Sequence, residues 1–204
     1  NYPAPVFNKS FYESNDLIAS ISKVTYNIVS DVTKNVENIY LPHAVNSKFF
    51  TQMSEDDISK MRKNHGIDDK FVFFWNNRNA RRKMSGSLIL WFKKFCEQIG
   101  KDKATLIMHT DPNDPYGQPL EHLLEHFGLT DGQIRLSKDK VSSENLALMY
   151  NMADCTVNIS DAEGFGLSTL ESLSCGTPII ATMTGGLQEQ VTDGKNWFGI
   201  GIEP

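Results

Sequence analysis

Two glutamates, Glu163 and Glu171, enclose a glycine-containing segment that has the composition of an anion-binding turn. The segment follows the apolar run 155–159 and leads into a helical stretch that ends near 175–176. Glycines at a strand-to-helix turn let backbone N–H groups approach a ligand closely, and the helix N-terminus adds partial positive charge. Carboxylates beside a phosphate site would bind hydroxyl groups rather than the phosphate. An anion next to a polyol is the description of a nucleotide sugar.

A cluster of cations follows a second apolar run, 71–75. Arg78, Arg81, Arg82 and Lys83 place four positive charges within six positions, where they could hold a diphosphate. Arg81 and Arg82 fit a solvated surface equally well, so the prediction rests on Arg78 and Lys83.

A third glycine-containing segment, Gly185-Gly186, comes directly after the run 178–181. It could bring backbone close to the same ligand, or it could simply form a turn.

The elements that must position these groups can be read from the hydrophobic pattern. Apolar runs without in–out alternation are typical of parallel strands covered on both faces. Between the runs, stretches such as 88–99 and 143–152 have apolar residues at helical spacing. This alternation predicts a doubly wound α/β sheet whose ligands bind at the carboxyl ends of the strands. The expected strands are 71–75, 105–109, 134–136, 155–159 and 178–181, and the expected core residues of the first helix are Leu88, Trp91, Phe92, Phe95 and Ile99.

The first forty residues have a different organisation. A strand at 16–21, a helix at 23–31 and a strand at 37–41 are expected, and Pro42 then interrupts the pattern. Ser54 has the sequence of a helix N-cap, with Asp57 at the third helical position. We place a domain boundary near residue 35, so that 1–35 is the remnant of a preceding domain with its linker and 36–204 is the main domain. Both ends look cut, and we expect the main domain to be truncated at its C-terminus.

Composition excludes several classes of protein. The 204 residues are 40% hydrophobic and 22% charged, which is typical of a globular protein with a buried core. A net charge of −5 does not favour a general nucleic-acid or anionic membrane surface. Three widely spaced cysteines predict neither a disulfide framework nor a zinc site, and fit a reducing compartment. No run is long enough for a transmembrane segment, so we expect a cytoplasmic protein, peripheral to a membrane at most.

One motif points elsewhere. His122, Glu125 and His126 have the spacing of the inverted zinc-peptidase motif, His-x-x-Glu-His. Pro119 and Gly128 leave a helix of barely two turns, however, and no third metal ligand is evident. We therefore predict no metal site here, but a peripheral helix that packs inward through Leu120, Leu123, Leu124 and Phe127.

Taken in order, several segments resemble the C-terminal donor-binding domain of the large retaining glycosyltransferase family with the GT-B fold. Its Glu-x7-Glu signature matches Glu163 to Glu171, and the resemblance covers roughly residues 17–196. The sequence departs from the family pattern where Asn77 replaces a glycine, where Gln188 replaces a common proline, and in the bulky segment 195–198. The other matching segments are 41–45, 77–83, 150–160, 174–178 and 185–189.

The resemblance implies a role for each matching residue. Arg78 and Lys83 would neutralise the donor diphosphate, Glu171 would bind the ribose hydroxyls, and Glu163 would contact the transferred sugar. The base pocket would be formed by the segment from Ile134 to Lys138. Backbone contacts to sugar or phosphate would come from Gly164, Phe165, Gly166, Leu167, Gly185 and Gly186.

The resemblance also implies a reaction. The chain would be the Rossmann-like donor half of a GT-B enzyme that needs no metal, with a UDP- or GDP-sugar as donor and an unidentified acceptor. Residues 1–35 would be a remnant of the acceptor domain, and this chain alone would bind donor with little transfer. A nucleotide-sugar epimerase, a phosphorolytic relative and an inactive sugar-nucleotide-binding domain are the alternatives.

Overall fold

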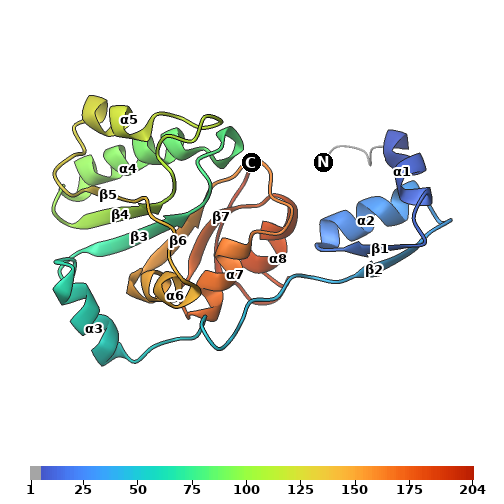
Figure 1. Cartoon of the computed structure of the whole chain (residues 1–204), viewed down its shortest axis with the longest axis horizontal. Coiled ribbons are helices and arrows are strands. Elements are labelled where there is room, and N and C mark those ends of the chain that lie inside the picture. Colours follow the sequence, from blue (N-terminus) through green and yellow to red (C-terminus); the bar gives the residue numbers. More distant parts are fainter. Residues whose placement is uncertain (1–5) are drawn as a thin grey trace.

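Six parallel strands form the central sheet of the larger unit (Figure 1). The protein is described here by a computed structural model that covers residues 6–204. The strand order is β5-β4-β3-β6-β7-β8, and every neighbouring pair is parallel. The strands are β3 (Phe71–Asn76), β4 (Ala104–His109), β5 (Ile134–Ser137), β6 (Cys155–Asn158), β7 (Ile179–Thr182) and β8 (Gly199–Ile202).

The strand order reverses in the middle of the sheet. From β3 the chain moves outward to β4 and β5, returns to pair β6 with β3, and then continues to β7 and β8 on the other side. The carboxyl ends of β3 and β6 therefore form a topological switch point, where open α/β sheets bind their ligands. The prediction of a Rossmann-like, doubly wound parallel sheet is confirmed.

Helices cover both faces of this sheet (Figure 1). Trp75 of β3 packs in one core with α4 (Ser85–Ile99) and α5 (Leu120–Phe127). Val72 and Phe74 point to the opposite face and pack with α6 (Ser143–Met152). The remaining helices of this unit are α3 (Glu55–Asn64), α7 (Leu167–Ser174) and α8 (Gln188–Val191), with short 3-10 turns at Arg81–Lys83 and Gly185–Leu187.

Most of the expected core positions are correct. In α5, Leu120 and Leu124 are buried, and the other two predicted positions pack against the same core. In α4 the prediction is wrong for Trp91 and Ile99, which are 50% and 40% exposed. The buried stripe of α4 includes Ile89, so that Trp91 lies outside it, and Ile99 is the final residue of the helix.

A smaller unit precedes the main sheet. Its strands β1 (Leu17–Ser20) and β2 (Glu37–Tyr40) pair in parallel, with α2 (Lys23–Val32) between them. The predicted boundary near residue 35 assigns β2 to the following domain, whereas in the structure β2 pairs with β1 and the six-stranded sheet starts at β3. The unit also contains a 3-10 turn at Val6–Asn8 and α1 (Lys9–Glu13), which the sequence analysis did not anticipate.

The small unit is tied to the main one at α8. The Glu189 carboxylate accepts hydrogen bonds from the Lys23 backbone N–H at 3.2 Å and from the Tyr40 hydroxyl at 3.0 Å. Beyond this junction, Ser54 caps α3 as predicted, because its hydroxyl accepts from the Asp57 N–H at 3.2 Å. The contacts of Glu189 therefore join the two units at α8.

Two further sequence predictions concern cysteines and membrane segments. Cys96, Cys155 and Cys175 are buried free thiols, as expected from their number and spacing. Within residues 6–204, the structure contains no helix with both the length and the apolar composition needed to span a bilayer.

Candidate functional site

A cavity of about 450 Å³ opens at the carboxyl ends of β3 and β6. Its walls come from the loops after these strands, from the first turn of α7 and from the linker between the two units. The residues that line it are Ile21, His43, Asn76, Asn77, Lys83, Glu163, Gly164, Phe165, Gly166, Leu167, Ser168 and Glu171. The sequence analysis predicted seven of these twelve as site residues, so the cavity lies where the motifs converge.

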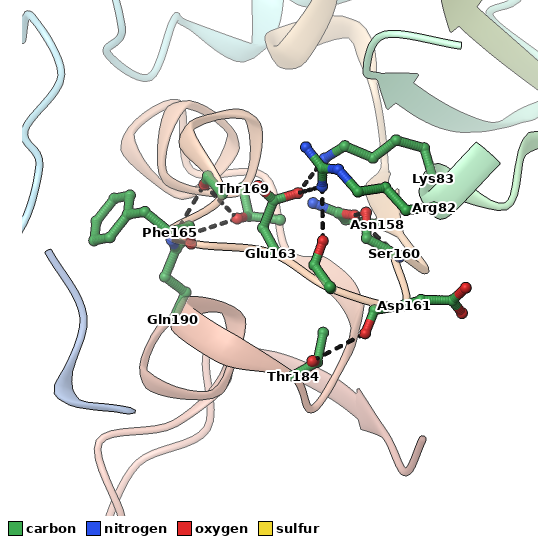
Figure 2. Close-up of polar contacts among 12 residues, drawn as sticks. Arg82, Lys83, Asn158, Ser160, Asp161, Glu163, Phe165, Thr169, Thr184 and Gln190 are labelled. Atoms are coloured by element: carbon green, nitrogen blue, oxygen red, sulfur yellow. Dashed lines mark hydrogen bonds and ion pairs between the residues drawn. The ribbon is translucent and has the colours of Figure 1, made fainter. Parts of the chain in front are cut away.

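The turn before α7 has the close-packed geometry that its glycines predict. Gly166 is the N-cap, with φ of 92°, and a Cβ there would lie 2.5 Å from the Leu187 side chain. The buried Gln190 side chain holds the turn in place, since its Nε2 donates to the carbonyls of Phe165 at 2.7 Å and Gly166 at 3.1 Å (Figure 2). The N-terminus of α7 is thereby fixed toward the cavity, where it favours an anion.

Gly185 and Gly186 support this turn from the side away from the cavity. A Cβ on Gly185 would lie 1.7 Å from the Glu163 carbonyl oxygen, and one on Gly186 would lie 2.6 Å from the Phe165 Cα. The Gly186 N–H donates to the Glu163 carbonyl at 3.2 Å. The glycines therefore pack against the Glu163 loop and do not line the cavity, so their predicted contact with a ligand stays a prediction.

Lys83 and Glu163, which both line the cavity, form an ion pair (Figure 2). The Lys83 side chain is only 8% exposed and that of Glu163 12%. Burial lowers the pKa of Lys83, and the contact with the Glu163 carboxylate opposes that change. Arg82 adds a second cation, since its Nη1 lies 2.6 Å from the Ala162 carbonyl oxygen and 3.4 Å from Glu163 Oε2.

Glu171 lines the cavity from α7. Burial raises the pKa of this carboxyl, and a hydrogen bond from the Tyr150 hydroxyl at 2.7 Å opposes that change. Both members of the Glu-x7-Glu pair therefore face one cavity, one beside a cation and the other beside a phenol.

Arg78 does not reach the cavity in this structure. Its guanidinium donates to the Asp114 carboxylate at 2.6 and 3.2 Å and lies 5.1 Å from the centre of the Tyr116 ring. Its side chain is 61% exposed, and the adjacent carboxylate raises its pKa. The two cations that the sequence analysis paired, Arg78 and Lys83, thus have separate carboxylate partners.

The predicted base-pocket segment lies on β5, two strands away from β3. Ile134 is 5% exposed and packs in the core beneath α4 and α5. Lys138 follows the strand and contacts the Glu121 carboxylate at the surface. Neither residue lines the cavity, and their proposed contact with a base stays a prediction.

Several cavity residues were not predicted as site residues. Asn76 and Asn77 follow β3, and the general rule for α/β sheets places the ends of such strands at the ligand. His43 comes from the linker and meets the Phe165 ring edge-on, with centroids 5.2 Å apart. It belongs to the matching segment 41–45, which is the signal that could have identified it. Within residues 6–204, no group of three His, Cys, Asp or Glu side chains is positioned to hold a metal ion.

Comparison with known proteins identifies the class of the chain. A family model described as "Glycosyl transferases group 1" matches residues 57–202. D-inositol 3-phosphate glycosyltransferase of Paenarthrobacter aurescens is 40% identical over 76 residues, which are 37% of this chain and 18% of that protein. A GDP-mannose-dependent phosphatidylinositol monomannoside mannosyltransferase of Mycolicibacterium smegmatis is 28% identical over 163 residues, 76% of this chain and 41% of that protein.

The fold of the chain is similar to that of a solved structure. The Anabaena protein HepE, crystallised in complex with UDP-glucose, superimposes with a TM-score of 0.77 at 20% identity, over 98% of this chain and 54% of HepE. The chain belongs to the glycosyltransferase group 1 family, and its main unit is a Rossmann-like domain of the GT-B type. It spans at most about half the length of these three proteins.

Proposed function

We propose that this chain is the donor-binding part of a retaining glycosyltransferase that moves a sugar from a nucleoside-diphosphate sugar to an acceptor and needs no metal ion. The observation that carries the proposal is the convergence of Lys83, Glu163, Glu171 and the N-terminus of α7 on one cavity at the switch point of the sheet. A cation and a helix N-terminus suit a diphosphate, and two carboxylates suit the hydroxyl groups on either side of it.

The spacing of these groups suggests how a donor would lie. Glu171 would accept hydrogen bonds from the ribose, and Lys83 together with the first turn of α7 would receive the diphosphate. Glu163 would bind hydroxyls of the sugar, and because Glu163 contacts Lys83, the sugar–phosphate bond would lie beside this pair. Because Lys83 is largely shielded from water, its charge would act on the phosphate more strongly than an exposed lysine.

The reaction follows from this arrangement. As the bond between the anomeric carbon and the phosphate oxygen breaks, its electrons stay with the nucleoside diphosphate, and nearby cations stabilise the added charge. An acceptor hydroxyl would attack from the face that the phosphate leaves and pass its proton to the departing phosphate oxygen, which retains the anomeric configuration. Lys83, Arg82 and a reoriented Arg78 would supply the charge that Mg²⁺ provides elsewhere. The acceptor would be held by another domain of the whole enzyme.

The donor is proposed to be a UDP- or GDP-sugar. One relative is named as GDP-mannose-dependent, and HepE was crystallised with UDP-glucose. These names support both bases equally, so the base must be identified by binding.

The test is a thermal-shift titration of the 204-residue chain with UDP, GDP, ADP and their common sugar conjugates, with and without EDTA. A ligand at a hundred times its Kd stabilises by about 2.7 kcal/mol. For a domain of this size, each kcal/mol raises Tm by about 2–4 °C. We expect a base-selective shift that EDTA leaves unchanged.

A pair of variants makes the test specific to the cavity. Glu171→Ala removes the proposed ribose ligand and is expected to abolish most of the shift. Glu97→Ala, an exposed glutamate of α4, is the matched control and should keep it. No shift with any nucleotide would contradict the donor site, and a shift lost in EDTA would contradict metal independence.

Retention requires a measurement on the whole enzyme. Slow hydrolysis of the donor, followed by proton NMR, reports the anomer first released without the need to know the acceptor. Release of the donor's own anomer is expected. The opposite anomer would disprove a retaining reaction, and conversion of the donor sugar without release would point to an epimerase.

A further inference from the structure

The Tyr150 hydroxyl contacts residues from two walls of the cavity, but Tyr150 does not line the cavity itself. Tyr150 is on α6 and is fully buried. Its Oη lies 2.8 Å from Asn76 Nδ2, at the end of β3, and 2.7 Å from Glu171 Oε2 on α7. Asn76 and Glu171 both line the cavity. A single buried hydroxyl therefore joins a residue of the β3 wall to a residue of the α7 wall.

The direction of these hydrogen bonds is determined by the groups involved. The Asn76 amide nitrogen can only donate, an ionised carboxylate can only accept, and a phenol has one proton. Tyr150 therefore accepts from Asn76 and donates to Glu171. Burial holds the pKa of Tyr150 well above its ordinary value, so the phenol remains a donor at every physiological pH.

The hydrogen bond from Tyr150 uses only one of the two oxygens of the Glu171 carboxylate. Oε2 receives the Tyr150 proton, and no residue of the described range 6–204 hydrogen-bonds Oε1. With Oε2 fixed, rotation of the carboxylate is restricted, and Oε1 stays available to accept a further hydrogen bond. A flexible carboxylate would lose more conformational freedom when it binds a diol than one that is already oriented.

We infer that Tyr150 is a positioning residue, whose hydroxyl fixes one oxygen of Glu171 so that the other is presented to the ribose hydroxyls of a bound nucleotide. The inference rests on the proposed function and adds a residue on a different helix to the donor site. Tyr150 acts through Glu171 and does not touch the nucleotide.

The experiment compares wild type and Tyr150→Phe by calorimetric titration with the nucleoside diphosphate that wild type binds, and with its 2′,3′-dideoxy analogue. Phenylalanine keeps the edge-on packing of the ring with Phe74 and Phe50, at centroid distances of 5.0 and 6.2 Å. Affinity for the ribonucleotide should fall on the order of tenfold, as expected for a hydrogen bond to a charged group. Affinity for the dideoxy analogue should not change, because it has no hydroxyls for Glu171 to bind.

A second comparison removes Glu171 itself. In the Glu171→Ala background, Tyr150→Phe should have no further effect on ribonucleotide affinity, since the two residues act as one unit. The matched control is Tyr40→Phe, which also removes a hydroxyl that donates to a glutamate, but at the Glu189 junction outside the cavity. That variant should bind like wild type.

The possible failures are distinct. If wild type binds no nucleoside diphosphate, the proposed function fails and this inference fails with it. If wild type binds, the inference is overturned when Tyr150→Phe leaves ribonucleotide affinity unchanged. It is also overturned when the variant weakens both nucleotides equally, because that pattern indicates a general packing role.

Discussion

Two ion pairs formed by the same loop differ sharply in their surroundings. Lys83 and Glu163 are 8% and 12% exposed and form one wall of the cavity. Arg78 lies only five positions before Lys83 in the sequence, yet its side chain is 61% exposed and pairs with Asp114 outside the cavity. Both partners of the first pair are shielded from solvent, whereas in the second pair Asp114 is 10% exposed and only the Arg78 guanidinium is open to solvent and salt. A charged motif in the sequence therefore contains residues with very different energetic roles.

The comparison predicts its largest effect at the buried pair. Lys83→Ala removes the closer of two cations from the Glu163 carboxylate, which is 12% exposed, and leaves Arg82 at 3.4 Å. Breaking a buried ion pair costs about 3 kcal/mol of stability. Loss of the charge–phosphate contact should also lower nucleotide affinity by about 100-fold. Thermal unfolding and calorimetric titration measure the two effects.

Lys60→Ala is the matched control, since Lys60 pairs with Asp57 on α3 and these two side chains are 75% and 57% exposed. Both its Tm and its nucleotide affinity should remain those of wild type. If Lys83→Ala bound nucleotide with wild-type affinity, Lys83 would not be part of the donor site. The proposal that burial strengthens its contact with the phosphate would then fail as well.

At the Arg78–Asp114 pair, the two partners should have opposite effects. Arg78→Ala is expected to weaken nucleotide binding on the order of tenfold if the guanidinium turns to the diphosphate. Asp114→Asn should strengthen it by about threefold, because it releases Arg78 from a competing carboxylate. Asparagine can still accept the Tyr116 N–H, which Asp114 accepts at 2.9 Å, so the loop is preserved.

Titration of both variants with the same nucleotide decides between two roles for Arg78. Weaker binding by Asp114→Asn would show that the pair holds the loop in its active shape. Equal nucleotide affinity in wild type, Arg78→Ala and Asp114→Asn would show that Arg78 is a surface residue with no role in nucleotide binding.

Glu171 differs from both ion pairs, because this half-buried carboxylate is hydrogen-bonded by a phenol and is not paired with a cation. Its pKa is raised above the ordinary 4.5, so the folded protein holds this proton more tightly than the unfolded chain does. The stabilising effect is complete below pH 4.5 and is lost as the pH rises through the raised pKa. Glu171→Gln should therefore have a higher Tm than wild type at pH 7, with a difference that disappears toward pH 4.

The same variant should bind nucleotide more weakly, so stability and binding move in opposite directions. Glu97→Gln provides the comparison for an exposed glutamate, with no pH-dependent gain. A lower Tm for Glu171→Gln at pH 7 would contradict the view that an ionised Glu171 is kept for binding.

The sequence was sufficient for the parts of the molecule that depend on local pattern. Buried parallel strands are continuous apolar runs, and glycine turns before α7 have few alternatives, so the sheet and the Glu163–Glu171 segment were predicted correctly. The orientation of Arg78 was not predictable, because its partner Asp114 is 36 positions away and a long exposed side chain has many rotamers. The pairing of β2 with β1 likewise depends on a contact that composition does not reveal.

The smallest effect is expected at a third ion pair, in which both side chains are exposed. Lys138, after β5, contacts Glu121, and their side chains are 51% and 42% exposed. Ile134 at the start of the same strand is buried in the core, so any base contact from this segment must come from its other end. Lys138→Ala should change nucleotide affinity by less than about threefold, as for other solvated pairs. Titration with UDP, GDP and ADP would also reveal a change in base preference. A larger loss of affinity that is confined to one base would show that a solvated cation can define the base pocket. In that case, the exposure of a side chain would not be enough to distinguish the functional cations of this chain from its surface charges.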